Sequence, residues 1–445
     1  MRAKIDQQLL LTPGFSEHRR AKQLVEISGV LDRQPTVLDL IHEDLTAGVR
    51  SDLGRKGLSA DQVLRILILQ RVTRCSFDAL EFAINDSELY WNFCRIGVGR
   101  RITRSRIHAN VHKVQPTTIE AVNRIALQAA IAEKVETVER TRTDATVTET
   151  NIHAPTDSSL LWDATRMIGQ IMEKAARVFR VTFTDRRQEA KREYVGAATS
   201  ANAEERVPHY KALVDLVGEA LADTARVVQE LRSATKQAKL ATKLVKKLET
   251  LAALGQRVVD QTRKRVFEGK KVPSAKKVVS MSEPHTDIIV KDRHNVFYGH
   301  KVTLTTGASG LVLDCFVETG NPADSTLAVR SVQRLKAAYG KVPSQVAFDG
   351  GYASQENLTK LKAEGVKDVA FSKGRGLKVA EMLRDPVNYP MLRNFRAGIE
   401  AGIAYLKTAV GLRRCVWRGP LGFCAYVWGG VLAANLLTLA RRNLA

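Results

Sequence analysis

The chain has 445 residues, of which 44% are hydrophobic and 26% are charged, which excludes wholesale disorder and allows roughly two to four domains. Its 69 Lys and Arg outnumber its 47 Asp and Glu, giving a formal net charge of +22. This excess indicates a polyanionic partner, with nucleic acid ahead of an anionic membrane surface.

Five cysteines occur without a CxxC pair, and their odd number argues against a disulfide framework or a zinc site. We therefore expect a reduced, cytosolic protein, and the first residues lack the apolar core of a secretory signal. Residues 421–440 are apolar and long enough to span a membrane. They also contain Asn435, Thr438 and three glycines, so we predict a buried core helix and no membrane contact.

The first 56 residues predict a peripheral helical segment, and residues 57–135 predict a compact helical domain. Ser59 and Gln62 have the spacing of a capping box before an apolar helix. Two further helices precede a basic one, for which Thr103 or Ser105 is the expected N-cap. This order is typical of helix-turn-helix DNA-binding domains, although a plain bundle with a solvated basic face remains open. The candidate DNA-binding residues are Arg100, Arg101, Arg104 and Arg106.

A second basic segment lies in the helical insertion predicted at residues 159–280. Residues 232–277 hold 14 Lys and Arg against 3 Asp and Glu, so this segment contributes half of the net charge. Leucines recur there at helical spacing, which predicts a long amphipathic helix with a basic stripe for phosphates. A solvated coiled-coil arm is the alternative. The candidate DNA-binding residues are Lys243, Lys246, Lys247, Arg263, Lys264 and Arg265.

The rest of the chain alternates predicted strands and helices, which indicates an α/β core made of residues 136–158 and 281–445. A Thr- and Val-rich strand begins at 140, and residues 298–319 predict a hairpin with its turn at 307–310. A helix at 324–339, a strand ending at Asp349, another helix and a strand at 368–371 follow. The last predicted elements are a helix at 393–414 and the apolar helix beyond it.

Helix 393–414 sets an acid beside an apolar stripe. At 100° per residue, Arg396, Glu400 and Lys407 lie together along the edge of that stripe. An isolated acid in this position is usually a salt-bridged surface residue. Two more acids give Glu400 another interpretation.

Asp144 lies in the first strand, and Asp349 ends a short apolar strand directly before Gly350 and Gly351. Ligands bind at the carboxyl ends of strands in sheets with helical crossovers, and glycines allow close approach to the backbone. Three carboxylates without a His or Cys cluster suit Mg²⁺ or Mn²⁺. We therefore predict that Asp144, Asp349 and Glu400 hold two metal ions for attack on a phosphodiester, with Arg396 and Lys407 supporting them.

Several segments resemble the DDE transposases of bacterial insertion sequences, close to the insertion sequence five group and its unassigned relatives. They are TDATVTETNIHAPTDSSLLWD, YGHKVTL, VAFDGGY and RAGIEAGIAYLK. The resemblance covers most of residues 57–440 and implies an RNase H-like core. It also implies that Asp144, Asp349 and Glu400 are the catalytic triad. In the related signature Tyr-x2-Arg-x3-Glu-x6-Lys, Arg396, Glu400 and Lys407 match, whereas Arg393 replaces the tyrosine.

The resemblance further implies a cytoplasmic, nucleoid-associated bacterial protein that binds double-stranded DNA at terminal inverted repeats and at its target. It implies cleavage at the element ends, transfer of the 3′-hydroxyl into the target, and a homodimer on DNA. Asp157 and Asp163 are rivals for the first acid, but Asp157 is expected to cap a helix. Asp324 is likewise expected to cap the helix that follows it, although a role near the three acids remains open. An RNase H-like nuclease without strand transfer and a catalytically inactive DNA-binding repressor remain alternatives.

Overall fold

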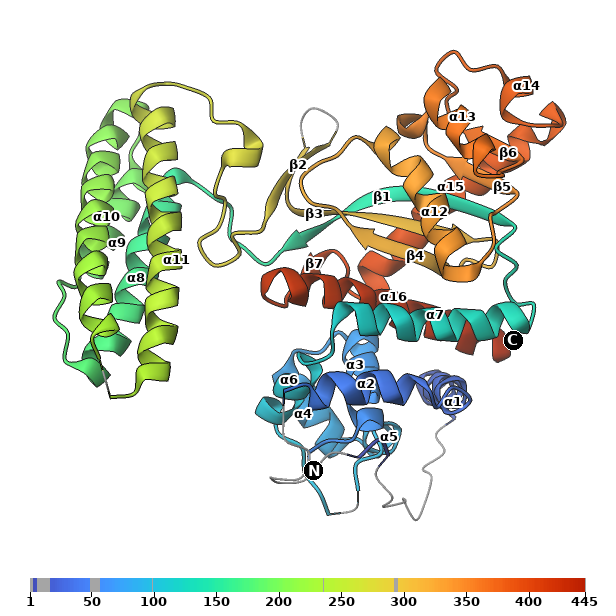
Figure 1. The fold of residues 1–445 in the computed structure, drawn as a ribbon, viewed down its shortest axis with the longest axis horizontal. Coiled ribbons are helices and arrows are strands. Elements are labelled where there is room, and N and C mark those ends of the chain that lie inside the picture. The colour runs from blue at the N-terminus through green and yellow to red at the C-terminus, as the bar shows by residue number, and fades with distance from the viewer. Residues whose placement is uncertain are drawn as a thin grey trace. The chain divides into compact units, whose positions relative to one another are not determined.

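The computed structural model describes residues 3–5, 17–48, 57–97, 99–234, 236–291 and 295–444 (Figure 1). The chain divides into two compact units. One unit comprises Met1–Glu149 and His300–Ala445, and the other comprises Thr150–Gly299. The peripheral segment predicted at 1–56 falls partly outside the described residues, and its described part contains α1 (Arg19–Asp32) and α2 (Val37–Thr46).

The helical region predicted at 57–135 contains five helices of the first unit. The capping box is confirmed, because Ser59 accepts from the Gln62 backbone and the Gln62 side chain accepts from the Ser59 backbone. The basic helix begins directly after Thr103, one of the two predicted N-cap positions. The helices are α3 (Ala60–Thr73), α4 (Phe77–Asp86), α5 (Glu88–Phe93), α6 (Arg104–Val111) and α7 (Pro116–Ala132).

The strands form a mixed sheet, which confirms the α/β class. Its path is β2-β3-β1-β5-β6, with β4 paired to β3 and β7 paired to β1. Strands β1, β5 and β6 are parallel, whereas β3 and β4 form the predicted antiparallel hairpin. The strands are β1 (Arg140–Thr150), β2 (Asp287–Lys291), β3 (Asn295–Gly307), β4 (Val312–Val317), β5 (Gln345–Phe348), β6 (Asp368–Phe371) and β7 (Arg414–Cys415).

The helix that carries Glu400 is α15 (Tyr389–Ala409), and it packs on β5 and β6 (Figure 1). The predicted bounds, 393–414, are wrong at both ends. The helix begins earlier because Pro390 is tolerated in the first turn, where its missing N–H is not needed. It ends earlier because Gly411 takes a φ of +75°, which leaves the right-handed helical region.

Three more helices follow the hairpin: α12 (Ala328–Tyr339), α13 (Gln355–Ala363) and α14 (Val379–Met382). The predicted helix at 324–339 is α12 preceded by a separate 3₁₀ turn, Asp324–Leu327. Helices α12 and α13 and strands β5 and β6 share one apolar core. This core includes residues of β5 and β6, the strands that end directly before Asp349 and Ser372.

The apolar helix α16 (Gly419–Asn443) packs on α1, α3 and α7 and forms the second core of this unit. Among the described residues it is the one helix long and apolar enough to cross a membrane, but 89% of its apolar window is buried inside the protein. The prediction of a buried core helix is therefore confirmed, and no membrane protein is indicated.

The second unit contains four helices that lie side by side (Figure 1). They are α8 (Asp157–Phe179), α9 (Arg187–Thr199), α10 (Ala203–Arg232) and α11 (Ala238–Thr262). The amphipathic helix predicted in the basic segment is α11, whose Leu244, Leu248, Leu251 and Leu254 are buried in the bundle core. A π-helical turn, Arg263–Phe267, follows it directly.

Asn435 of α16 stabilises the start of β4, so replacing it tests the packing of the first unit. Its side chain accepts from the Val312 N–H and donates to the Val312 carbonyl, with both distances between 2.8 and 2.9 Å. Asn435→Leu should lower the free energy of unfolding by about 2–4 kcal/mol, because both Val312 groups stay buried without partners. Chemical denaturation of the full chain measures this.

Leu421→Ala, at a 66% exposed position of the same helix, is the control and should change stability by less than about 0.5 kcal/mol. Equal stability of the two variants would contradict this account of the α16 packing.

Candidate active site

Asp144 and Asp349 are brought together by the register of two parallel strands. β1 pairs with β5 from Arg140 opposite Gln345 to Thr143 opposite Phe348. Each acid is the next residue after that last pair. The two carboxylates therefore lie at adjacent positions of neighbouring strands, at the carboxyl end of β5 as the sequence predicted.

Asp349 is held by Ser372, which directly follows β6. The Ser372 hydroxyl donates to Asp349 Oδ1 over 2.7 Å and accepts from the Gly350 N–H over 3.0 Å. Burial alone would raise the pKa of Asp349, but the Ser372 hydrogen bond and the Arg396 charge outweigh it and leave the pKa below its usual value. Asp349 is therefore ionised at neutral pH.

Arg142 of β1 fixes where α15 docks on the sheet. Its guanidinium donates to the Phe395 carbonyl over 2.6 Å and to Thr306 Oγ1 over 2.9 Å, and it lies 4.7 Å from the centre of the Phe395 ring. A Cβ built on Gly398 would be 2.1 Å from Arg142 Nη1, so a glycine is required for this approach. The next residue after Phe395 is Arg396, which is thereby placed above Asp144.

The guanidinium of Arg396 contacts all three predicted acids. Its Nη2 is 2.8 Å from Asp144 Oδ2 and 3.4 Å from Asp349 Oδ1, and its Nη1 is 3.1 Å from Glu400 Oε1. The Arg396 and Asp144 side chains are only 13% and 18% exposed, whereas Glu400 is 69% exposed. Asp144 thus lies at the floor of the site, Asp349 is 46% exposed, and Glu400 lies at the open side.

The chemistry of this donor set suits a hard divalent cation, because carboxylate oxygens are the ligands that Mg²⁺ and Mn²⁺ prefer. Within the described part of the chain, no group of three or more His, Cys, Asp or Glu is close enough to hold a metal ion as placed here. The Arg396 guanidinium lies among the acids and supplies the positive charge. The residues therefore fit a divalent cation that takes the place of this guanidinium.

The other predicted supporting positions lie along the same helix. Lys407 follows Glu400 by seven residues, about two turns, and is half-buried. Arg393, which occupies the tyrosine position of the signature, is exposed and lies about one turn before Arg396. Neither residue is part of the three ion pairs around Arg396.

The rival acids Asp157 and Asp163 both lie on α8 in the second unit. Asp157 pairs with Arg265 at 2.8 Å, and Asp163 pairs with Arg166 at 2.5 Å. The expectation that Asp157 caps this helix is wrong, because the N-cap is Thr156. Both acids have cationic partners within their own bundle.

The ten predicted DNA-binding residues are all exposed. Four of them lie in or just before α6 of the first unit, and six lie on α11 and the π-helical turn after it. In α11, the lysines occupy the face opposite the buried leucines, as the periodicity predicted. These positions stay predicted DNA contacts.

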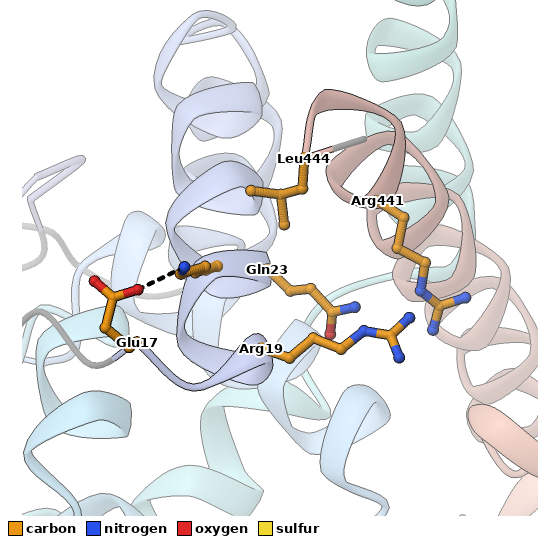
Figure 2. Close-up of a pocket in the computed structure, with 6 residues that line it drawn as sticks. Glu17, Arg19, Gln23, Arg441 and Leu444 are labelled. Atoms are coloured by element: carbon orange, nitrogen blue, oxygen red, sulfur yellow. Dashed lines mark ion pairs between the residues drawn. The ribbon is translucent and has the colours of Figure 1, made fainter.

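A separate pocket gathers basic side chains between α1 and the end of α16 (Figure 2). The Arg19 and Arg441 guanidinium groups extend toward the same space near Gln23, while Lys22 pairs with Glu17 at 2.6 Å (Figure 2). The pocket contains none of the three acids, so it lies apart from the candidate active site. No feature of the sequence indicated it.

Arg142 and Ser372 were missed in the sequence. Ser372 could have been found, because it follows a strand adjacent to the one that ends at Asp349. Arg142 left no comparable signal, since its partners Phe395 and Gly398 are far along the chain on another element.

Comparison with known families gives one match. Residues 257–436 match the family described as Transposase DDE domain. The matched segment includes Asp349, Arg396 and Glu400 but not Asp144, and it covers less than half of the chain. No curated protein and no solved structure matches the chain. The match supports a DDE transposase, and the mixed sheet is consistent with an RNase H-like core.

Replacing Ser372 tests the electrostatics of the site. Ser372→Ala should raise the pKa of Asp349, because the hydrogen bond that favours its ionised form is lost. A group with a depressed pKa stabilises the fold above its unfolded pKa, and this stability is lost as pH falls through the folded pKa. Acid unfolding of the variant should therefore begin at higher pH, and carboxyl NMR titration measures the pKa directly.

Ser372→Thr, which keeps the hydroxyl, is the matched control and should titrate like the unmodified chain. An unchanged or lower pKa of Asp349 in Ser372→Ala would show that the serine does not stabilise the carboxylate.

Proposed function

We propose that this protein is a DNA transposase of the DDE type, which cuts its element's ends and joins them to target DNA. The observation that carries the proposal is the set of three ion pairs from Arg396 to Asp144, Asp349 and Glu400. The net charge of +22 and the transposase family match support the same function. In this proposal the sheet is an RNase H-like core of the kind found in insertion sequences of group five or their unassigned relatives.

The proposed reaction has two phosphoryl-transfer steps. In the first, a water oxygen forms a bond to phosphorus at the element end while the bond to the 3′-oxygen breaks, which frees a 3′-hydroxyl. In the second, that hydroxyl oxygen bonds to a target phosphorus and displaces a target 3′-oxygen. The nucleophile must approach in line with the leaving oxygen, so positioning supplies much of the rate.

The carboxylates of Asp144, Asp349 and Glu400 would hold Mg²⁺ or Mn²⁺, in two sites. When bound, such ions lower the pKa of water and stabilise the leaving oxygen. Asp349 can bind a cation without first losing a proton, because its pKa lies below the usual value. Arg396, once released from the acids, is placed to hold a DNA phosphate by a bidentate contact.

DNA would be held by the two basic regions, one at Arg100, Arg101, Arg104 and Arg106 and the other along α11 and its following turn. Two ends must be joined in one event, so we propose a homodimer in the DNA complex. Terminal inverted repeats and target DNA are the double-stranded partners.

Cleavage of terminal-repeat DNA tests the proposed mechanism. Asp349→Ala and Glu400→Ala should each reduce Mg²⁺-dependent cleavage and joining by at least about a hundredfold, since each removes a carboxylate of the site. A gel assay that separates nicked DNA from joined products measures both steps. Cleavage without joined products would favour a nuclease.

Glu356→Ala, a 73% exposed acid of α13 paired only with Lys360 among the described residues, is the matched control and should retain activity. Full activity in either active-site variant would refute the mechanism. Tight DNA binding without cleavage by the unmodified chain would favour a repressor.

The salt dependence of DNA binding tests the α11 surface. Replacing Lys243, Lys246 and Lys247 with Ala should make the slope of log K against log salt shallower by about 0.9 for each lysine that contacts phosphate. Lys270→Ala is the control in the same basic segment, because Lys270 is already paired with Glu268 at 2.8 Å. Fluorescence anisotropy measures these slopes. If the triple variant and the unmodified chain have the same slope, α11 is excluded from the DNA interface.

A further inference from the structure

The hydroxyl of Tyr352 has an unusual environment beside the candidate active site. Tyr352 is fully buried, and among the described residues its hydroxyl oxygen has no hydrogen-bond partner. Tyr352 ends the 3₁₀ turn Gly350–Tyr352, whose N-cap residue is Asp349. Burial raises the pKa of the phenol most, and the charges of Asp324, Asp144 and Asp349 raise it further. Burying an unpaired hydroxyl costs free energy, and a hydrogen bond to a ligand of the site would remove that cost.

Asp324 is fixed at this place by a buried lysine. Lys301 Nζ donates to Asp324 Oδ1 over 3.0 Å and to the Pro322 carbonyl over 2.6 Å, and its side chain is only 8% exposed. The sequence predicted that Asp324 caps the following helix, but the N-cap residue there is Ala323 and no side-chain cap bond forms. The carboxylate is therefore held by β3 and not by its own helical turn.

The second oxygen of Asp324 faces the turn that follows Asp349. A Cβ built on Gly351 would lie only 3.1 Å from Asp324 Oδ2. Asn357 ties the two segments together, since its Nδ2 donates to the Ser325 carbonyl over 2.7 Å and to the Tyr352 carbonyl over 2.8 Å. Asp324 and Tyr352 are thus positioned relative to each other by the hydrogen bonds of Lys301 and Asn357.

We propose that Asp324 is a fourth carboxylate of the cation site and that the Tyr352 hydroxyl oxygen accepts a hydrogen bond from a water molecule of the bound, hydrated divalent cation. Mg²⁺ keeps several water molecules when protein carboxylates bind it, and the O–H groups of these waters need acceptors around them. Once Arg396 is released, four carboxylates against the charge of Lys301 leave a formal charge of −3, which favours divalent cations. The inference rests on the proposed function, because it concerns the same site.

Binding of Mn²⁺ to the full chain, measured by calorimetry, tests the role of Asp324 without an activity assay. Asp324→Asn should weaken binding by roughly tenfold or more. Gly351→Ala should also weaken it, though by less, because the added methyl group requires Asp324 Oδ2 to shift by a few tenths of an ångström while all four carboxylates remain. This second variant keeps the test valid if Asp324→Asn does not fold. Glu356→Gln is the control and should bind Mn²⁺ like the unmodified chain.

Thermal unfolding with and without Mn²⁺ tests the role of Tyr352. Tyr352→Phe should be at least as stable as the unmodified chain without the ion, because the unpaired hydroxyl is gone. It should gain less stability when Mn²⁺ is added, since the stabilisation by a ligand grows with the logarithm of its affinity. An equal gain in both proteins would overturn the assignment of Tyr352.

The outcomes separate this inference from the proposed function. If Asp349→Asn loses Mn²⁺ binding while Asp324→Asn and Gly351→Ala bind normally, the fourth carboxylate is refuted and the proposed function stands. If Asp349→Asn binds Mn²⁺ as tightly as the unmodified chain, or if the unmodified chain does not bind it, both proposals fail.

Discussion

The candidate site depends on one guanidinium, that of Arg396, which forms ion pairs with three carboxylates. Arg396 and Asp144 are 252 residues apart in the chain, yet they meet at 2.8 Å. Like charges at such short range repel, so the acids could not be gathered this way without a cation among them. Arg396 neutralises one of the three formal charges, so the acids keep a formal charge of −2 while it is in place and −3 once it leaves, and both values favour binding of a divalent cation. Arg396 thus stabilises the three acids close together, and its guanidinium occupies the position where we expect a cation to bind.

The position of Arg396 follows from how α15 docks on the sheet. Arg142 and Gly398 fix the helix along its axis, and a shift by one turn would move Arg396 about 5.4 Å from the acids. The parallel register of β1 and β5 independently sets Asp144 beside Asp349. The docking of α15 therefore sets the position of Arg396 and Glu400, and the register of β1 and β5 sets the position of Asp144 and Asp349.

Local patterns in the sequence predicted the elements and the three acids, but not the contacts between distant segments. Asp349 could be found because an apolar strand ends there before two glycines, and Glu400 because helical spacing sets it beside Arg396. Arg142 and Tyr352 could not be found, since their importance depends on partners on other elements. Asp324 was interpreted as a helix cap because its local context suits one, whereas a tertiary contact with Lys301 determines its orientation.

The central claim is that a divalent cation replaces the Arg396 guanidinium among the acids. Anomalous diffraction from crystals of the full chain grown with Mn²⁺ tests it most directly. The account predicts an Mn²⁺ peak within about 2.0–2.3 Å of carboxylate oxygens from Asp144 and Asp349, with Arg396 no longer in contact with both acids. A structure in which Mn²⁺ binds elsewhere while Arg396 still bridges the acids would contradict it.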